Sequence, residues 1–508
     1  MNDQFMNASI LLTTLNARYM HTAFGLRYLY ANLGDLKVQA LLQEFTIQQR
    51  PIDIAEKLLL SQPEIIGFSI YIWNVIQTSE VIDLIKTIAP QVKIIVGGPE
   101  VSFPADLPGV CDQVDYVICG PGEISFAKLC QQILAGKSPL NHVIAGESVD
   151  LKLLKPPYPY YSAEDIRNRL IYVEASRGCP FKCEFCLSSL DKTAKPFELE
   201  SFLQQMDSLY LRGARNFKFI DRTFNLKVST SVAILEFFLK RMTDDLYLHF
   251  EVIPDNLPAR LKQILVKFPE NSLQFEIGVQ TFDPEIQKLI SRKQNNQKTC
   301  ANLRWLRNNT GAHIHADLIF GLPGDKLENF AKSFDQLVAL RPQEIQLGIL
   351  KRLRGAPINR HTERFQLRYN PIAPYNILST RDIDFTTMQR VSRFARYWDM
   401  IGNSGRFHQI LPLILGNDPF SRFLLLSDRL FDQVGSTWKI SLKRIFELLY
   451  SVLTGQMKIN PGVARKALNL DYIQSGQKGR LELEGPGLKV VCRTGIANKR
   501  QQKHLGTN

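Results

Sequence analysis

The chain has 508 residues, of which 45% are hydrophobic and 22% are charged. These fractions are typical of a globular protein, and the length exceeds what one ordinary core holds, so we expect about two to four domains. No run approaches the ~18 apolar residues of a membrane span, and the opening MNDQFMNASILL lacks the basic and apolar regions of a secretory signal. The formal net charge of +13 allows a nucleic-acid or anionic partner, although a solvated basic surface is the simpler explanation.

The first ~150 residues alternate apolar runs with helical patterns. Near-continuous apolar strands separated by helices favour a parallel sheet that is buried on both faces. We therefore predict a doubly wound, Rossmann-like (flavodoxin-like) α/β domain over residues 1–150, with strands at 9–17, 39–45, 64–73, 93–101 and 115–123.

Such sheets bind ligands at the carboxyl ends of their strands. The loops expected at those ends are LNARYMHTAFG, YIWN, GGPE and GPGE, and their glycines let a backbone approach a bulky ligand closely. Because no G-x-G-x-x-G follows the first strand, the sequence does not favour a dinucleotide as that ligand.

Residues 151–168, with three prolines, are interpreted as an interdomain linker. A second β/α series follows and predicts an open (β/α)6 barrel of the TIM type over 169–365, with chemistry at its C-terminal strand ends. Its strands are expected at 169–178, 216–224, 247–254, 273–282, 314–324 and 344–355. Residues 366–508 contain helical patterns and no chemical motif, so we predict a mainly helical domain there.

Three of the eight cysteines, Cys179, Cys183 and Cys186, form C-x-x-x-C-x-x-C directly after the first expected barrel strand. Three thiolates can hold three irons of a [4Fe–4S] cluster and leave the fourth iron open. A structural zinc site would need a fourth ligand, and the nearest candidate, His142, lies before the linker. We expect Glu184 and its neighbour Lys182 on the solvent side of this loop.

The other five cysteines, Cys111, Cys119, Cys130, Cys300 and Cys492, stand alone in apolar or helical surroundings. This pattern is typical of small buried hydrophobes and not of a disulfide framework. It predicts a reducing, cytoplasmic compartment.

The segment RGCPFKCEFC, with an aromatic residue before its last cysteine, resembles the signature of the radical S-adenosylmethionine (SAM) enzymes. The resemblance implies an enzyme whose cluster binds SAM through the open iron and cleaves it to a 5′-deoxyadenosyl radical. Later strand ends resemble the subgroup that includes the oxygen-independent coproporphyrinogen oxidases, although its second-strand GGE is replaced by IDRTFN at 220–225. The SAM-binding residues that these resemblances imply are Phe185, Asp221, Glu251, Gln280, Arg292 and Asp317.

Because it precedes a barrel of this kind, the N-terminal domain resembles the cobalamin-binding domain that is fused to many radical enzymes. The motif D-x-H-x-x-G, which places a histidine below cobalt, is absent; His21 lies in the right loop, but a helix-start or core role fits it better. The cobalamin contacts that the resemblance implies are Asn16, Tyr19, His21, Ser69, Tyr71, Gly97, Gly98, Pro99, Gly120, Gly122 and Glu123. The C-terminal part resembles an uncharacterised domain found behind some such fusions.

The resemblance implies a cobalamin-dependent radical enzyme, most simply a methyltransferase, acting on a small and conceivably anionic substrate with a flavodoxin or ferredoxin as electron donor. Lys351, Arg352 and Arg354 could hold such an anion or merely cover the barrel rim. Alternatives are ring formation or rearrangement, radical modification of RNA, which is less favoured, a non-catalytic iron–sulfur or cobalamin sensor, and a zinc-stabilised scaffold. No membrane association is expected.

Overall fold

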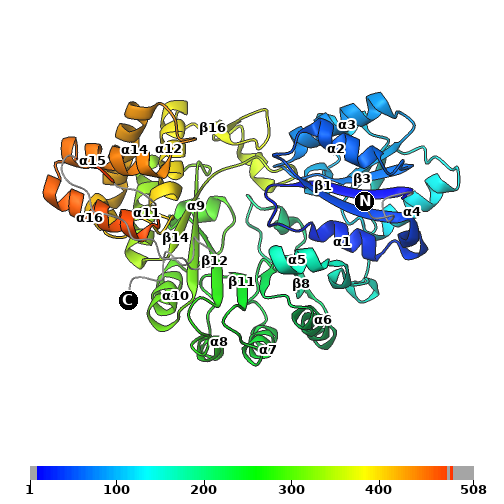
Figure 1. Cartoon of the computed structure of the whole chain (residues 1–508), viewed down its shortest axis with the longest axis horizontal. Helices are drawn as coiled ribbons and strands as arrows, with labels where there is room; N and C mark the ends of the chain where they lie inside the picture. The colour runs from blue at the N-terminus through cyan, green and yellow to red at the C-terminus, as the bar shows by residue number, and fades with distance from the viewer. Residues whose placement is uncertain (1–7, 478–480, 484–508) are drawn as a thin grey trace. The chain divides into compact units, whose positions relative to one another are not determined.

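The computed structural model describes residues 8–477 and 481–483 (Figure 1). The chain forms two compact units that exchange segments: the first holds the residues up to 251 with 351–360 and 370–376, and the second holds 252–350, 361–369 and 377 onward. Among the described residues, no helix has the length and apolar character needed to cross a membrane.

The first unit contains the predicted doubly wound domain. Its sheet has the order β2-β1-β3-β4-β5-β6, and every recorded pairing is parallel. This order reverses direction between β1 and β3, which marks the switch point where such sheets bind ligands. The strands are β1 Ile10–Asn16, β2 Ala40–Thr46, β3 Ile65–Ser69, β4 Lys93–Gly97, β5 Tyr116–Cys119 and β6 Val143–Ala145.

Helices cover both faces of this sheet, as the near-continuous apolar strands predicted (Figure 1). Helices α2 (Pro51–Leu59) and α3 (Val75–Ile88) pack on one face, in a core that includes Leu11, Ile66 and Val96. Helices α1 (Phe24–Ala31) and α4 (Glu123–Leu134) pack on the other, around Ile10, Leu12 and Ile95. Successive side chains of a strand point to opposite faces, so each apolar strand contributes to both cores.

Two local features differ from the sequence prediction. Strand β6 was not expected, because three residues in a polar segment give no measurable periodicity; it adds to the sheet edge beside β5. The predicted linker ends in helix α5 (Ala163–Asn168). A capping box formed by Ser162 and Asp165 stabilises the N-terminus of this helix. The domain boundaries stay a prediction.

The linker is also tied to the N-terminal domain by a buried ion network. Arg27 of α1 pairs with Glu44 of β2 at 2.6 Å and with Asp165 of α5 at 2.7 Å. Arg169 pairs with the same two carboxylates, each at 2.8 Å. Two guanidinium groups thus face two carboxylates, which keeps the buried charge balanced.

The second sheet has the order β7-β10-β11-β12-β13-β14, so its strands lie in chain order as a partial (β/α)6 barrel requires. The prediction of six strands in this region is confirmed. They are β7 Ile171–Val173, β10 Asn216–Phe219, β11 Tyr247–Val252, β12 Leu273–Gln280, β13 His313–Phe320 and β14 Glu344–Ile349. Connecting helices include α6 (Leu199–Leu211), α7 (Val228–Leu239), α8 (Ala259–Leu265), α9 (Pro284–Leu289), α10 (Asn296–Asn309) and α11 (Leu327–Leu340).

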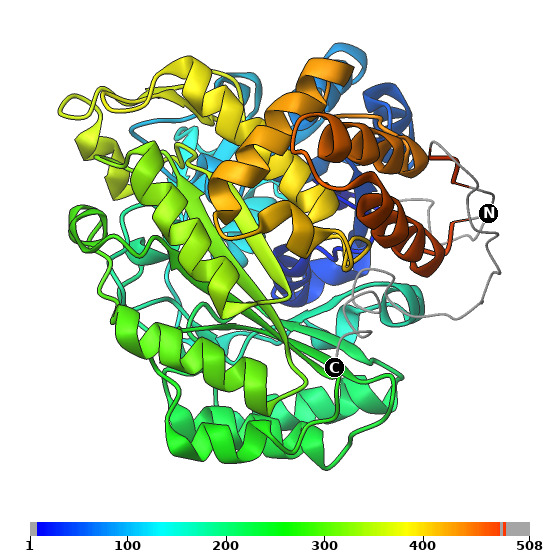
Figure 2. The same cartoon turned by 90° about the vertical axis from the view of Figure 1, so that its left-hand side faces the viewer.

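The C-terminal part of the second unit is helical, as predicted (Figure 2). Its helices are α12 Phe385–Ile401, α13 Leu411–Leu415, α14 Pro419–Val434, α15 Leu442–Gly455 and α16 Pro461–Gln474. The buried Asn403, after α12, docks them to the edge strand β14: its amide oxygen accepts from Ile345 N at 2.9 Å and its amide nitrogen donates to Ile345 O at 2.8 Å. The side chain thus pairs with an edge that would otherwise expose backbone groups.

Candidate active site

The switch point of the first sheet is organised by Asn74, a fully buried side chain at the start of α3. Its amide nitrogen donates to Leu15 O and to Ser69 O, at 3.1 and 3.2 Å, and its amide oxygen accepts from Tyr71 N at 2.8 Å. One side chain therefore joins the ends of β1 and β3. The following loop carries Tyr71 stacked on Trp73, with ring centroids 4.3 Å apart.

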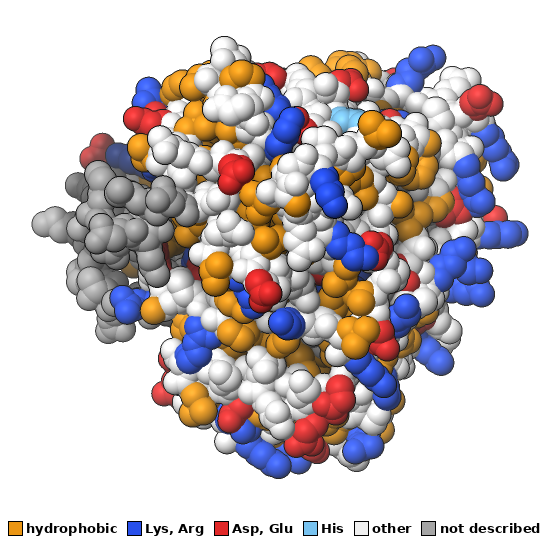
Figure 3. All heavy atoms as spheres, turned by 90° about the vertical axis from the view of Figure 1, so that its right-hand side faces the viewer, with side chains coloured by type: hydrophobic (Ala, Val, Ile, Leu, Met, Phe, Trp, Pro, Cys, Tyr) orange, Lys and Arg blue, Asp and Glu red, His pale blue; other side chains and the backbone are white. Residues whose placement is uncertain are grey.

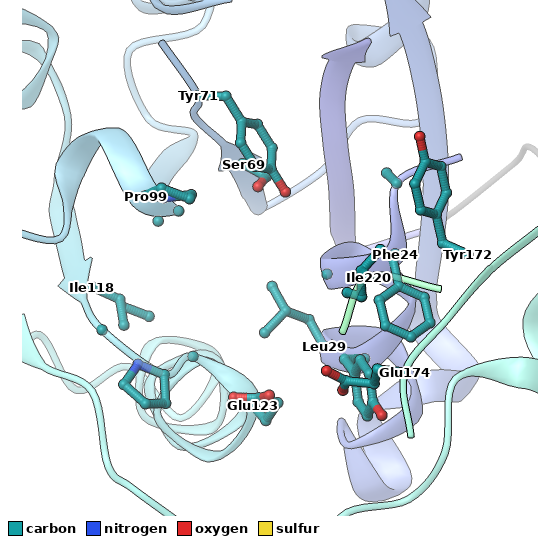
Figure 4. Close-up of a pocket in the computed structure, with 18 of the residues that line it drawn as sticks. Phe24, Leu29, Ser69, Tyr71, Pro99, Ile118, Glu123, Tyr172, Glu174 and Ile220 are labelled. Carbon is teal, nitrogen blue, oxygen red and sulfur yellow. The ribbon is translucent and has the colours of Figure 1, made fainter. Parts of the chain in front are cut away.

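A cavity of about 810 Å³ opens at these strand ends, within the first unit. Figure 4 shows Tyr71, Pro99 and Ile118 on one side of it, and Phe24, Tyr172 and Glu174 on the other. The lining continues from the N-terminal sheet into the cysteine loop, through Ser176, Arg177, Gly178, Ser188 and Asp191, and into the segment after β10, through Ile220 and Arg222.

Most of the residues predicted to contact cobalamin line this cavity. They are Asn16, His21, Ser69, Tyr71, Gly97, Gly98, Pro99, Gly120, Gly122 and Glu123. Tyr19 lies apart: it is exposed and donates to Glu164 at 2.5 Å. Room at glycine-lined strand ends, with apolar Phe24, Leu29 and Ile118 between them, fits a large corrin ring. The individual cobalamin contacts stay predictions.

His21 is engaged by the barrel. Its Nδ1 lies 2.8 Å from the hydroxyl of Tyr172, on β7. Burial lowers the pKa of His21, and the positive charges of Lys218, Arg18 and Arg169 lower it further. The imidazole is therefore neutral at pH 7 and hydrogen-bonded, which fits the packing role that we favoured for it.

The three cysteines of the motif carry free thiols; Cys179 and Cys183 are buried and Cys186 is half-buried. The loop is held by backbone hydrogen bonds, from Cys179 N to Asp191 O at 3.1 Å and from Cys186 N to Cys183 O at 3.2 Å. Burial raises the pKa of the Cys179 thiol, and Cys186 and Cys183 raise it further. Phe185 is half-buried between them in the chain.

The chemistry of the donor set fits a [4Fe–4S] cluster, because three cysteine thiolates can hold three of its irons. Among the residues that the structure describes, no three His, Cys, Asp or Glu side chains are grouped as a single metal ion would require. His142 is used elsewhere, with its ring nitrogens 3.0 Å from Asp115 O and 2.8 Å from Cys111 O. Thiolates of a [4Fe–4S] cluster each hold a different iron and need not converge on one point.

One expectation for this loop is wrong. Glu184 is buried, with its side chain 3% exposed, and it pairs with Arg360, whereas Lys182 is exposed as expected. The backbone carbonyl of Glu184 also accepts from Ile358 N at 2.9 Å. The segment after β14, which includes Ile358 and Arg360, therefore packs on the cysteine loop. Local sequence patterns do not predict this long-range contact.

Two predicted SAM ligands lie beside the cysteine loop in the first unit. Asp221 accepts from Ala175 N at 2.9 Å and from Ser176 Oγ at 2.6 Å, and burial raises its pKa to about 7. Both oxygens thus support the strand that leads into the cysteines. Glu251 accepts from Arg222, with both carboxylate oxygens 2.9 Å from Nη1, and Arg222 also lines the cavity.

Gln280 and Arg292 come together in the second unit. Gln280 ends β12 at a register shift with φ of 69°, and its amide oxygen is buried without a hydrogen-bond partner in the structure. A Cβ on Gly278 would lie 2.4 Å from the Gln280 amide nitrogen, so glycine makes room for that amide. Arg292 donates to Gly278 O. A buried amide with an unused acceptor, next to a guanidinium, suits a polar ligand such as SAM.

Asp317 belongs to a polar cluster on β13. His315 Nε2 lies 3.2 Å from Asp317 Oδ1, and His315 Nδ1 lies 3.7 Å from Glu344 Oε2 on β14. Burial opposes protonation of His315, but the hydrogen bond to Asp317 and the charges of Asp317, Glu276 and Glu344 raise its pKa to about 9. The carboxylate predicted to bind SAM is thus held by an imidazolium.

Sequence reasoning missed Arg177 and Glu174 as parts of the site, and it gave Glu123 only as a cobalamin contact, not as a partner of Arg177. Arg177 Nη1 lies 2.7 Å from Glu123 Oε1, and Nη2 lies 2.6 Å from Glu174 Oε1. All three line the cavity. The available signal was only their place in the segment EASRGC and in the GPGE loop, because the pairing joins residues 54 positions apart.

Comparison with known proteins finds a family match for each of the three predicted regions of the chain. Residues 10–130 match the family described as B12 binding domain, residues 173–337 match the radical SAM superfamily, and residues 363–484 match a family described as a protein of unknown function, DUF4080.

Two curated relatives are each 23% identical to the chain. An uncharacterised methyltransferase of Pyrococcus horikoshii aligns over 56% of the chain and 67% of its own length. The cobalamin-dependent radical SAM methyltransferase TokK of Streptomyces tokunonensis aligns over 81% of the chain and 65% of its own length. The chain thus spans about two thirds of these relatives.

Among solved structures, the cobalamin-dependent SAM radical enzyme OxsB with aqua-cobalamin bound has a TM-score of 0.61. It is 16% identical, with 92% of this chain and 79% of that chain covered, so the likeness concerns the fold. Residues 173–337 thus form a radical SAM domain behind a cobalamin-binding domain, which makes the protein a radical SAM enzyme with the [4Fe–4S] cluster and SAM that such domains use.

Proposed function

We propose that the protein transfers a methyl group from SAM to an unactivated carbon or phosphorus of a small molecule. The observation that carries the proposal is the shared cavity: residues at the cobalamin-type strand ends and residues of the cysteine loop line one space of about 810 Å³. A cluster held by the three cysteines of the adjoining loop would supply the electron that cleaves SAM, and cobalamin in this space would supply the methyl group. A substrate placed in this space would lie between the two.

The chain's own residues position these groups and exclude water. Cys179, Cys183 and Cys186 would hold three irons, and the buried Asp221 supports the strand that carries them. Phe24, Leu29 and Ile118 give the cavity an apolar wall, and such a wall protects a reactive radical from side reactions. Polar groups on the cluster side, among them Ser176 and Arg222, remain to orient substrate or SAM.

The substrate's charge and the electron donor stay predictions. Radical SAM enzymes use an external reductant, and we keep a flavodoxin or ferredoxin in a cytoplasmic setting as the proposed source. Arg352 pairs with Asp106, and Arg354 pairs with Glu100 at 2.9 Å and with Asp106 at 2.5 Å. Both arginines already form ion pairs within the protein. They therefore do not support the prediction that the substrate is an anion.

The face shown in Figure 3 gives no support to a nucleic-acid substrate. On the face shown in Figure 3, Lys and Arg side chains are spread among acidic and apolar ones. A nucleic-acid site is instead expected to gather basic residues on one face. A small molecule therefore remains the proposed substrate.

The test uses the full chain, reconstituted anaerobically with iron, sulfide and hydroxocobalamin, then given dithionite and SAM with a trideuterated methyl group. Radical cleavage releases 5′-deoxyadenosine, and methyl transfer from SAM to cobalamin leaves S-adenosylhomocysteine. We expect both products from the wild-type chain. Omitting cobalamin should remove S-adenosylhomocysteine but not 5′-deoxyadenosine.

Cys183→Ala is the matched negative variant, and Cys300→Ala, at a buried cysteine outside the motif, is the control. We expect at least a 100-fold loss of 5′-deoxyadenosine in the first and wild-type amounts in the second, because only the first removes a cluster ligand. An intact cluster spectrum with no cleavage in the wild-type chain would instead indicate a sensor. Cleavage without any S-adenosylhomocysteine would rule out methyl transfer.

A further inference from the structure

Arg177 occupies the one position of the cysteine loop that reaches the cobalamin-type domain through paired charges. It lies two residues before Cys179, in the short strand β8 (Ser176–Arg177). Glu123, its partner at 2.7 Å, is the first residue of α4 and directly follows the loop Gly120-Pro121-Gly122. A single guanidinium therefore joins the loop expected to meet cobalamin with the loop expected to hold the cluster.

The contact is enclosed and geometrically specific. The Glu123 side chain is 10% exposed and that of Glu174 is 5% exposed, so both carboxylates depend on Arg177 to balance their charge. The guanidinium also lies over the ring of Tyr28, 4.9 Å from its centroid. A planar fork can donate to two carboxylates in fixed directions, which a lysine ammonium cannot do.

A buried ion pair is often only structural, and the same unit offers a comparison. The network of Arg27, Glu44, Asp165 and Arg169 is equally buried and also ties the N-terminal domain to the chain that follows it. None of its members lines the cavity, whereas Arg177, Glu123 and Glu174 all do. Of these two buried networks, the Arg177 group is the one that lies between the two predicted cofactor sites.

We propose that Arg177 is a positioning residue that couples the two sites, so that bound cobalamin strengthens SAM binding at the cluster and bound SAM strengthens cobalamin binding. Each ligand orders its own loop, and because Arg177 holds the loops together, the second ligand meets a loop that is already ordered. Such coupling is reciprocal and is commonly about 5- to 150-fold in affinity. The inference rests on the proposed function, since it needs both ligands to bind.

The test measures coupling rather than turnover. The full chain carrying its reconstituted cluster is titrated with hydroxocobalamin, followed by its visible spectrum, with and without saturating SAM and with no reductant. We expect SAM to lower the hydroxocobalamin Kd of the wild-type chain by at least 5-fold. In Glu123→Gln the ratio of the two Kd values should fall to about 2 or less, because the charge partner of Arg177 is lost.

Asp165→Asn is the matched control, since it removes a buried carboxylate from Arg27 and Arg169, which lie outside the cavity; it should keep the wild-type ratio. Glu123→Asp is the second variant: it keeps the charge but shortens the reach, and it too should lose the coupling. Iron content verifies that each variant holds its cluster. Equal ratios in the wild-type chain and both Glu123 variants would overturn the proposal, while a wild-type chain that binds no hydroxocobalamin would overturn the proposed function itself.

Discussion

Gly98 shows why one residue type is needed in the turn after β4. Its φ is 108°, and a Cβ built on it would lie 2.6 Å from Ile70 O. The sequence suggested that this glycine lets a ligand approach. The structure adds a second reason, because the turn itself packs against the backbone that ends β3, where Ile70 N donates to Gly97 O at 2.7 Å.

We predict that Gly98→Ala destabilises the chain by about 2–4 kcal/mol, through backbone strain and the clash with Ile70. The neighbouring Gly97→Ala is the control, because its Cβ would meet nothing closer than Ile118 O at 3.7 Å and its φ lies outside the left-handed range. The shift in the urea midpoint of the cofactor-free chain measures both. Equal midpoints for the two variants would contradict the assigned strain.

At the scale of elements, three adjacent strands build the polar cluster around His315. Asp317 comes from the same strand, Glu276 from β12 and Glu344 from β14, and Gln346 Oε1 lies 3.0 Å from His315 Nε2. The sequence shows that His315 and Asp317 share a face of a strand. It does not show which carboxylates neighbouring strands add, because that depends on register.

This cluster predicts a pH-dependent stability. The pKa of His315 is about 9 in the folded chain, above its ordinary value of 6.5, so the folded state binds the proton more tightly than the unfolded state. The stabilisation is complete below pH 6.5 and is lost as pH rises through about 9; it amounts to at most about 3 kcal/mol. His315→Gln should flatten this decline, as measured by urea unfolding between pH 6 and 10. An unchanged pH slope in the variant would count against the imidazolium.

At the scale of the whole molecule, the chain returns to its N-terminal domain after finishing the second sheet. Arg354, 254 residues from Glu100, pairs with it at 2.9 Å, and the two side chains are 10% and 3% exposed. Together with the contact of Arg360 to Glu184, this return explains why residues 351–360 belong to the first compact unit.

Arg354→Met should therefore destabilise the protein by about 3 kcal/mol, because it leaves Glu100 buried without its cation. Burial already raises the pKa of Glu100, so adding Glu100→Gln to the variant should recover much of the loss. Arg50→Met, which breaks an exposed pair with Asp53, should cost much less stability, because water screens that pair. Guanidinium unfolding compares the four chains, and a loss in Arg354→Met no larger than in Arg50→Met would contradict the role assigned to the pair.

The sequence by itself determined the class of the protein. Apolar strands that alternate with amphipathic helices dictate two parallel sheets, and three cysteines at fixed spacing directly after a strand indicate a cluster loop, since both signals are local. Most of the strand-end residues that the sequence predicted to meet a ligand also line the cavity, because parallel strands end at one edge of a sheet.

Only the tertiary structure decided how those ends are connected. Three contacts join residues far apart in the chain: Arg177 pairs with Glu123, Glu184 is buried under Arg360, and Asp221 holds Ala175 and Ser176 ahead of the cysteines. A charged side chain looks the same in sequence whether it faces solvent, ligand or a distant partner. What separates these cases is burial, which arises only when the elements pack.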